Sequence, residues 1–250
     1  MGSATATTRT SLRFDHVGMR FPDGTHAVDD VSFGLDRGEL VSVVGPSGCG
    51  KSTLLRIASG LTRCTQGTVE VDRTHLGYVF QDATLLPWRT VQANVELFAE
   101  LHGAAKDERR RLAAEAIELV GLQGFERHVP RRLSGGMRMR VSLARSLTMK
   151  PDVFLFDEPF GALDEITRER LNDELLRLFV GQQFAGLFIT HSVGEAVFLS
   201  TRVLVMSARP GRIVADVPVP FDYPRPPELR FDPAFAALAG EVSAALREAL

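Results

Sequence analysis

The sequence predicts an α/β fold in which a mostly parallel sheet is covered by helices on both faces and carries one inserted block of helices. Three observations predict it. Short apolar stretches alternate with segments of helical spacing along the 250 residues. A glycine-rich loop directly follows one apolar stretch and leads into a helix. A charged helical block separates the early strands from the later ones, and strands that alternate with helices form parallel sheets.

The first part of the chain contains five expected strands and one helix. Residues 1–11 are rich in Thr, Ser and Ala and are expected to form a flexible lead-in. The strands lie between Gly and Asp turns, and the helix follows the glycine-rich loop. The strands are expected at Leu12–Phe14, around Val31–Leu35, and at Leu40–Val44, Gly67–Val71 and Leu76–Phe80, and the helix at Lys51–Gly60.

The rest of the chain divides into a helical insert, a return to alternating elements, and a different C-terminal segment. The insert, about residues 82–150, has apolar residues at helical spacing and is expected to form helices at Val91–Gly103, Lys106–Val120 and Arg138–Thr148. Next come a strand at Val153–Phe156, a helix at Glu165–Phe179, a strand at Leu187–Thr190, a helix from Gly194 and a strand at Val203–Met206. We expect one domain over residues 12–215, then a Pro-rich segment over 216–250 that ends in an amphipathic helix near Pro233–Leu250.

Composition excludes several classes of protein. The net charge of −2 and a sequence pI near 6.3 give no basic footprint, so no nucleic-acid partner is expected. The two cysteines, Cys49 and Cys64, lack metal-ligand spacing and indicate a reducing compartment. No apolar run approaches the ~18 residues that would span a bilayer, so any membrane contact must go through a partner.

The glycine-rich loop carries the strongest chemical signal. It matches the phosphate-loop pattern G-x-x-x-x-G-K-[ST] between a buried strand and a helix, which predicts an ATP site with Mg²⁺. The expected binding residues are Gly45, Pro46, Ser47, Gly48, Cys49, Gly50, Lys51, Ser52 and Thr53. The glycines let backbone N–H groups surround phosphate oxygens, Lys51 reaches the β and γ phosphates, and Ser52 can ligate Mg²⁺.

Two further segments suit a nucleotide site. The strand Val153–Phe156 ends in Asp157 and Glu158. Beside a phosphate loop, Asp157 is expected to hold the water shell of the Mg²⁺ ion, and Glu158 is expected to polarise the attacking water. Ser134, Gly135 and Gly136 lie just upstream of the expected helix Arg138–Thr148 and offer N–H groups and a hydroxyl to an anion. A plain helix cap with flanking glycines is the alternative for this second segment.

These motifs, with others, occur in the order found in ATP-binding-cassette (ABC) ATPases. The ordered elements are the phosphate loop, Gln81, Leu133-Ser134-Gly135-Gly136, Leu155-Phe156-Asp157-Glu158-Pro159, Ala162-Leu163-Asp164 and Thr190-His191. The resemblance covers about Phe14 to Gly211. It implies a P-loop NTPase with an ABC ATPase core, an antiparallel β subdomain and an inserted helical subdomain.

The resemblance also implies roles for individual residues. Phe21 would stack on adenine, Gln81 would sense Mg²⁺ and water, and His191 would contact the γ-phosphate. Asp164 would bridge two sites, because ABC cassettes pair head to tail and Ser134–Gly136 of one copy would face the ATP on the other. The expected catalytic residues are therefore Glu158, His191, Gln81 and Lys51, and the expected metal residues Ser52, Gln81 and Asp157. Ordinary packing remains an alternative for Phe21 and His191.

The loop after Gln81 resembles the version in the nitrate, sulfonate and taurine group of ABC importers. In importers this region receives a membrane subunit, so the loop around Leu85–Trp88 would contact two permease subunits, served by an extracytoplasmic solute-binding protein. The segments Glu195–Leu199 and Ser207–Ile213 resemble the same group. The chain would then lie peripherally on the cytoplasmic face of the inner membrane. Core packing is the alternative for Trp88.

The sequence departs from the usual pattern without losing a catalytic group. Met137, Met139, Gly161 and Ser192 stand where other residues are common in the family. The leading interpretation is an ATP-hydrolysing importer subunit for a small anion such as nitrate, a sulfonate or taurine. Two alternatives stay open: a soluble ABC ATPase that acts as an assembly or regulatory factor, and a phosphate-loop kinase.

Overall fold

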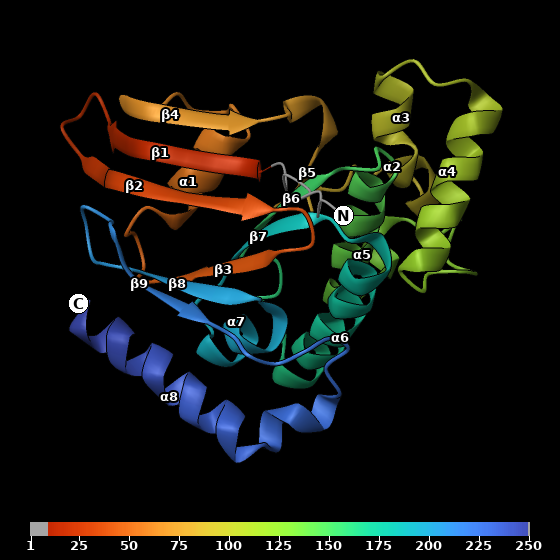
Figure 1. Ribbon diagram of the computed structural model, residues 1–250. Coiled ribbons are helices and arrows are strands. Elements are labelled where there is room, and N and C mark those ends of the chain that lie inside the picture. Colours follow the sequence, from red (N-terminus) through yellow and green to blue (C-terminus); the bar gives the residue numbers. More distant parts are fainter. Residues whose placement is uncertain (1–9, 250) are drawn as a thin grey trace, which may run out of the picture.

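The computed structural model describes residues 10–249 and contains a six-stranded sheet, a three-stranded sheet and a helical insert (Figure 1). This arrangement confirms the expected α/β fold. The expected lead-in, residues 1–11, lies outside the described residues except for Thr10 and Ser11, which begin the first strand. None of the helices within residues 10–249 combines the length and the apolar character needed to cross a bilayer.

The larger sheet has the strand order β5-β6-β7-β3-β8-β9, and its first five strands are parallel. Its strands are β3 (Leu40–Val44), β5 (Leu76–Val79), β6 (Val153–Asp157), β7 (Ala185–Ile189), β8 (Arg202–Met206) and β9 (Ile213–Pro218). The parallel strands are connected through helices, which are α1 (Lys51–Ala58), α5 (Gly135–Leu147), α6 (Glu165–Gln182) and α7 (Val193–Leu199). Parallel strands place their carboxyl ends at one edge of the sheet.

Alternating side chains give the sheet one core on each face. In β3, Val41 and Val43 belong to one apolar cluster, whereas Leu40 and Val44 belong to the other. The next strands repeat this alternation: Phe154 of β6 packs on the side of Leu40, and Leu155 packs on the side of Val41. Continuous apolar strands of this kind are expected only where both faces of a sheet are covered.

The smaller sheet is antiparallel, with the order β2-β1-β4. Its strands are β1 (Thr10–Arg20), β2 (His26–Asp36) and β4 (Gln66–Val71). The first two are much longer than the expected Leu12–Phe14 and Val31–Leu35. Polar residues face solvent along them and bulges shift the register, so the apolar pattern marks only part of each strand.

The helical insert differs from the expectation in two places. The expected helix Val91–Gly103 consists of two short helices, α2 (Val91–Val95) and α3 (Leu97–Leu101), which are followed by α4 (Lys106–Leu119). Helix α5 begins at Gly135 and not at Arg138, because Ser134 caps it by accepting a hydrogen bond of 3.2 Å from the Met137 N–H. One 3-10 turn, Arg73–His75, precedes the insert, and another, Pro130–Arg132, lies within it between α4 and α5.

The C-terminal part is tied to the larger sheet. Strand β9 was not expected, and it pairs antiparallel with β8, so the expected boundary at residue 215 falls inside a strand. A 3-10 turn at Pro227–Phe231 leads into α8 (Pro233–Glu248), which confirms the expected amphipathic helix. Helix α8 lies across the face of the sheet opposite β1, β2 and β4 (Figure 1).

Candidate functional site

Part of the predicted site lines a cleft at the carboxyl edge of the parallel strands, whereas Gly45, Pro46, Cys49, Asp157 and His191 are not among its lining residues. Strand β3 runs into the phosphate loop, β5 precedes Gln81, β6 ends at Asp157, and β7 precedes His191. The cleft has a volume of about 380 Å³. It is lined by Phe21, Thr25, Ala27, Ser47, Gly48, Gly50, Lys51, Ser52, Thr53, Gln81, Glu158 and Arg209. Ligands of open α/β sheets bind at this edge.

The phosphate loop needs glycine because of close backbone contacts. Gly50 has a φ of +110°, and a Cβ there would lie 2.7 Å from the Ala27 carbonyl oxygen. Lys51 is 5% exposed, and its Nζ donates to the carbonyls of Gly45 and Pro46 at 2.8 and 2.9 Å. The ammonium group is thus held over the loop, where the first N–H groups of α1 are also free.

Ser52 and Asp157 lie together beside the loop. The Ser52 hydroxyl donates to Oδ1 of Asp157 at 2.7 Å, and the Tyr78 hydroxyl donates to Oδ2 at 3.1 Å. Burial, followed by the nearby Asp157 charge, raises the pKa of Tyr78 well above its usual range, so the phenol remains a donor. A hydroxyl and a carboxylate are hard oxygen ligands, so the pair fits Mg²⁺ bound together with phosphate oxygens.

Glu158 lies beside His191. The distance from Oε2 of Glu158 to Nδ1 of His191 is 3.5 Å, and the side chains are 25% and 55% exposed. Glu158 has a φ of +47°, a left-handed conformation that costs free energy in a non-glycine residue. Its N–H donates to the Ile189 carbonyl at 3.0 Å, which fixes the turn after β6 against β7. The exposure of His191 favours the functional interpretation over that of a core histidine.

The residues expected to act across a dimer are not part of the cleft. Gly136 is buried, and a Cβ there would lie 3.0 Å from Cγ2 of Thr167 in α6. Asp164 caps α6 by accepting a 2.9 Å hydrogen bond from the Thr167 N–H, and this bond lowers the pKa of Asp164. None of Ser134, Gly135, Gly136 and Asp164 lines the cleft of its own chain.

Four residues of the site were missed by sequence reasoning. Thr25, Ala27 and Arg209 line the cleft, and Tyr78 supports Asp157. Strand pairing places Tyr78 opposite Leu155, two residues before Asp157, which brings the phenol to the carboxylate. No local signal marks Tyr78 or Thr25. Arg209 lay in a segment already noted for its resemblance to the importer group.

The loop after Gln81 is ordered around one buried side chain. Oδ1 of Asn94 accepts from the Leu86 N–H at 2.8 Å, and Nδ2 donates to the carbonyls of Leu86, Arg89 and Thr90. Asn94 is fully buried, whereas Trp88 is 75% exposed. The core-packing alternative for Trp88 is therefore wrong.

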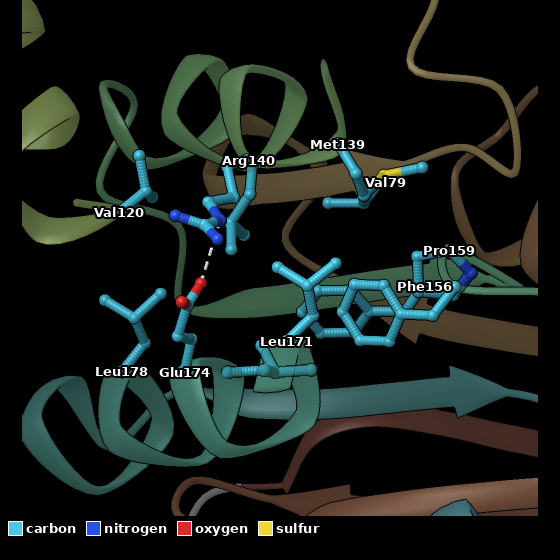
Figure 2. A pocket seen from close by; sticks show the side chains of 12 residues that line it. Val79, Val120, Met139, Arg140, Phe156, Pro159, Leu171, Glu174 and Leu178 are labelled. Atoms are coloured by element: carbon cyan, nitrogen blue, oxygen red, sulfur yellow. Dashed lines mark ion pairs between the residues drawn. The ribbon is translucent and has the colours of Figure 1, made fainter. Parts of the chain in front are cut away.

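A second, much smaller cavity lies between α5, α6 and the strands β5 and β6 (Figure 2). Its lining is apolar apart from the ion pair between Arg140 and Glu174, whose Nε and Oε2 atoms are 3.0 Å apart. Its volume of about 20 Å³ suffices for a water molecule. It contains none of the expected site residues.

Comparisons with known proteins agree with the geometry. A family model described as ABC transporter matches residues 28–161. The aliphatic sulfonates import ATP-binding protein SsuB 2 of Pseudomonas syringae pv. tomato is 44% identical over 90% of this chain and 94% of its own. The taurine import ATP-binding protein TauB of Pseudomonas aeruginosa is 47% identical over 84% of this chain and 81% of its own.

Solved structures show the same fold. A dimeric bacterial ABC transporter cassette superposes with a TM-score of 0.74 at 30% identity, over 84% of this chain and all of its own. The same cassette was also solved in a post-hydrolysis state bound to ADP and phosphate. The cbiO1 protein of Clostridium perfringens, part of an ABC transporter complex, gives a TM-score of 0.78 at 24% identity over 96% of both chains.

Proposed function

The chain belongs to the ABC transporter family, and from this premise we propose that it is the ATP-hydrolysing subunit of an importer. It would couple ATP binding, dimer closure and hydrolysis to solute uptake. One observation carries the proposal: Lys51, the Ser52–Asp157 pair and Glu158 converge at a single cleft. The solute class is drawn from the names of the relatives, which import aliphatic sulfonates and taurine. Small anions such as sulfonates, taurine or nitrate are the proposed cargo.

The chemistry follows from charge and position. Backbone N–H groups of the phosphate loop and the Lys51 ammonium bind the phosphates and stabilise the negative charge that develops during in-line attack. Glu158 accepts a proton from the attacking water as a general base, and His191 is placed beside it to contact the γ-phosphate. Ser52 and Asp157, with Gln81, would hold Mg²⁺, which neutralises phosphate charge.

The site is proposed to be completed by a second copy of the chain. Ser134 and Asp164 are exposed caps of α5 and α6, outside the cleft of their own chain. In a head-to-tail dimer they would face the cleft of the partner. The pair has two-fold symmetry, so each copy offers Ser134 and Asp164 to the other, and two equivalent sites result.

Complementation between two inactive variants tests this arrangement. Ser134→Arg blocks the face offered to the partner, and Lys51→Ala removes the ammonium, so each variant alone should lose turnover. A mixture forms heterodimers in which the intact Lys51 of one chain faces the intact Ser134 of the other. Restored phosphate release in the mixture supports the proposal, whereas a mixture as inactive as either variant contradicts it. Release of phosphate without transfer to an acceptor also excludes the kinase alternative.

The proposed membrane partner is a pair of permease subunits that contact the ordered loop around Leu85–Trp88, with an extracytoplasmic binding protein supplying the solute. The exposed Trp88 on a loop fixed by Asn94 supports docking there. Such a subunit would lie on the cytoplasmic face of the inner membrane. Reconstitution with the permease in vesicles, followed by sulfonate, taurine or nitrate uptake, tests the solute class. A soluble regulatory ATPase would support no uptake and bind no permease.

A further inference from the structure

Arg209 approaches the phosphate loop from the opposite end of the sequence. It lies in the turn between β8 and β9, and its Nε and Nη2 donate to the Gly48 carbonyl oxygen at 3.1 and 2.8 Å. The side chain is exposed and lines the cleft together with Phe21, Thr25 and Lys51. Arg209 thus lies between the outer rim of the phosphate loop and the side of the cleft where Phe21 is expected to stack on adenine.

The turn that carries Arg209 is fixed against the site. The Gly211 N–H donates to the Ala27 carbonyl at 3.0 Å, and the Asp29 N–H donates to the Gly211 carbonyl at 3.0 Å. A Cβ on Gly211 would lie only 2.1 Å from the Cys49 carbonyl oxygen, so the turn packs directly on the phosphate-loop backbone. The position of Arg209 is therefore set by main-chain contacts.

The guanidinium retains donors for a ligand. Of its five N–H groups, the contact with the Gly48 carbonyl uses one on Nε and one on Nη2, which leaves three. No carboxylate within residues 10–249 forms an ion pair with Arg209. Most of the other residues that line the cleft are neutral. Only Lys51 and Arg209 bring positive charge to the lining, against the carboxylate of Glu158. A planar guanidinium with free donors suits phosphate oxygens.

We propose that Arg209 is a nucleotide-binding residue, which holds the phosphate loop through Gly48 and donates hydrogen bonds to the polyphosphate of a bound nucleoside di- or triphosphate. This inference rests on the proposed function, because it needs the cleft to bind a nucleotide. It gives a role to the segment Ser207–Ile213, which neither the catalytic groups nor the dimer contacts use. It also makes the β8–β9 turn part of the site.

The test compares nucleotide affinities of purified variants. ATP and ADP binding are measured by calorimetric titration for the unmodified chain and for Arg209→Ala, Arg209→Lys, Arg212→Ala and Lys51→Ala. We expect Arg209→Ala to lower the affinity for both ATP and ADP about tenfold, the loss typical of a charge-assisted hydrogen bond. Arg209→Lys should lose less, because it keeps the charge but not the planar fork.

Arg212→Ala is the matched control. Arg212 lies in the same turn and pairs with Asp29, with Nε 2.9 Å from Oδ2, but it does not line the cleft. Unchanged affinity in Arg212→Ala supports a direct role for Arg209. Equal losses in both variants would show that only the integrity of the turn matters, and native affinity in Arg209→Ala would also overturn the inference.

Lys51→Ala separates this inference from the proposed function. If Lys51→Ala abolishes ATP binding while Arg209→Ala does not weaken it, only the assignment of Arg209 fails. If Lys51→Ala binds ATP normally, the cleft is not the nucleotide site and the proposed function fails with it. If Arg209→Ala does not fold, Arg209→Lys still tests the inference. Native affinity of Arg209→Lys for both nucleotides would contradict the need for the guanidinium.

Discussion

The Tyr78 hydroxyl donates a hydrogen bond of 3.1 Å to Oδ2 of Asp157, while the other oxygen of that carboxylate accepts from Ser52. Both carboxylate oxygens are thus oriented by protein side chains. Outer partners of this kind fix the direction of a metal-binding carboxylate.

Tyr78→Phe should therefore raise the Mg²⁺ concentration needed for half-maximal ATPase activity by about tenfold, the effect typical of removing such a partner. The measurement is ATPase rate against Mg²⁺ at saturating ATP. Tyr223→Phe is the control, because the Tyr223 hydroxyl donates to the Leu199 carbonyl away from the cleft. An unchanged Mg²⁺ requirement in Tyr78→Phe would show that Ser52 alone orients Asp157.

Glu158→Gln should retain ATP binding and lose turnover. The amide preserves the size of the side chain but cannot accept the proton of the attacking water, and loss of a general base costs about 10²–10⁴ in rate. Equilibrium binding and single-turnover hydrolysis measure the two effects separately. Glu165→Gln, at an exposed position outside the cleft, serves as the control. Hydrolysis at the unmodified rate in Glu158→Gln would refute its role as the base.

Trp88→Glu should abolish binding to the permease while leaving the ATPase activity of the isolated chain unchanged. The indole is 75% exposed, and a carboxylate in its place would remove the apolar contact and add a charge that must be desolvated. Co-purification with the permease measures the loss. Phe231→Glu is a matched control, since Phe231 is 85% exposed on the C-terminal 3-10 turn. Equal loss in both variants would argue against specific docking at this loop.

Glu195→Gln should stabilise the chain more at pH 8 than at pH 5. Glu195 is 7% exposed, and burial raises its pKa. Hydrogen bonds and positive charges nearby oppose part of this rise in pKa; they come from Thr190, Arg168, Asn172 and His191. Because the folded state holds the proton more tightly, stability falls as pH rises from the unfolded value of 4.5 towards the raised folded pKa.

Urea denaturation of both proteins at the two pH values measures this effect. The glutamine removes the ionisable group and its pH-dependent penalty, and all other titrating groups cancel in the comparison. Glu169→Gln, exposed on α6, is the control. A stability difference that does not change between pH 5 and pH 8 would show that Glu195 remains ionised at little cost.

The parts of the site that the sequence predicts are those that end parallel strands. Lys51, Asp157 and His191 each follow an apolar run, and the common direction of the runs brings their ends together. Residues positioned by tertiary register could not be predicted in this way. Arg209 contacts Gly48 across 161 residues, and no local pattern predicts this contact.

The same distinction holds for the fold. Strand β3 was predicted at its observed bounds, because every residue in it is apolar or small and buried. Strand β7 is also fully buried, but it was expected at Leu187–Thr190 and runs from Ala185 to Ile189. Edge strand β9 was missed, because alternate residues face solvent and a proline ends it. Helix α5 was expected to begin three residues late because glycines are poor helix formers, whereas the Ser134 cap stabilises the actual start.

Trp88 is the only tryptophan in the chain. Its exposed indole is therefore a built-in fluorophore, and when tryptophan is excited selectively over the two tyrosines, the emission reports the polarity at this loop. A shift of that emission to shorter wavelength on addition of a partner would signal burial of this loop in real time. The chain therefore needs no added dye to record contact at Trp88 while ATP is turned over in the cleft.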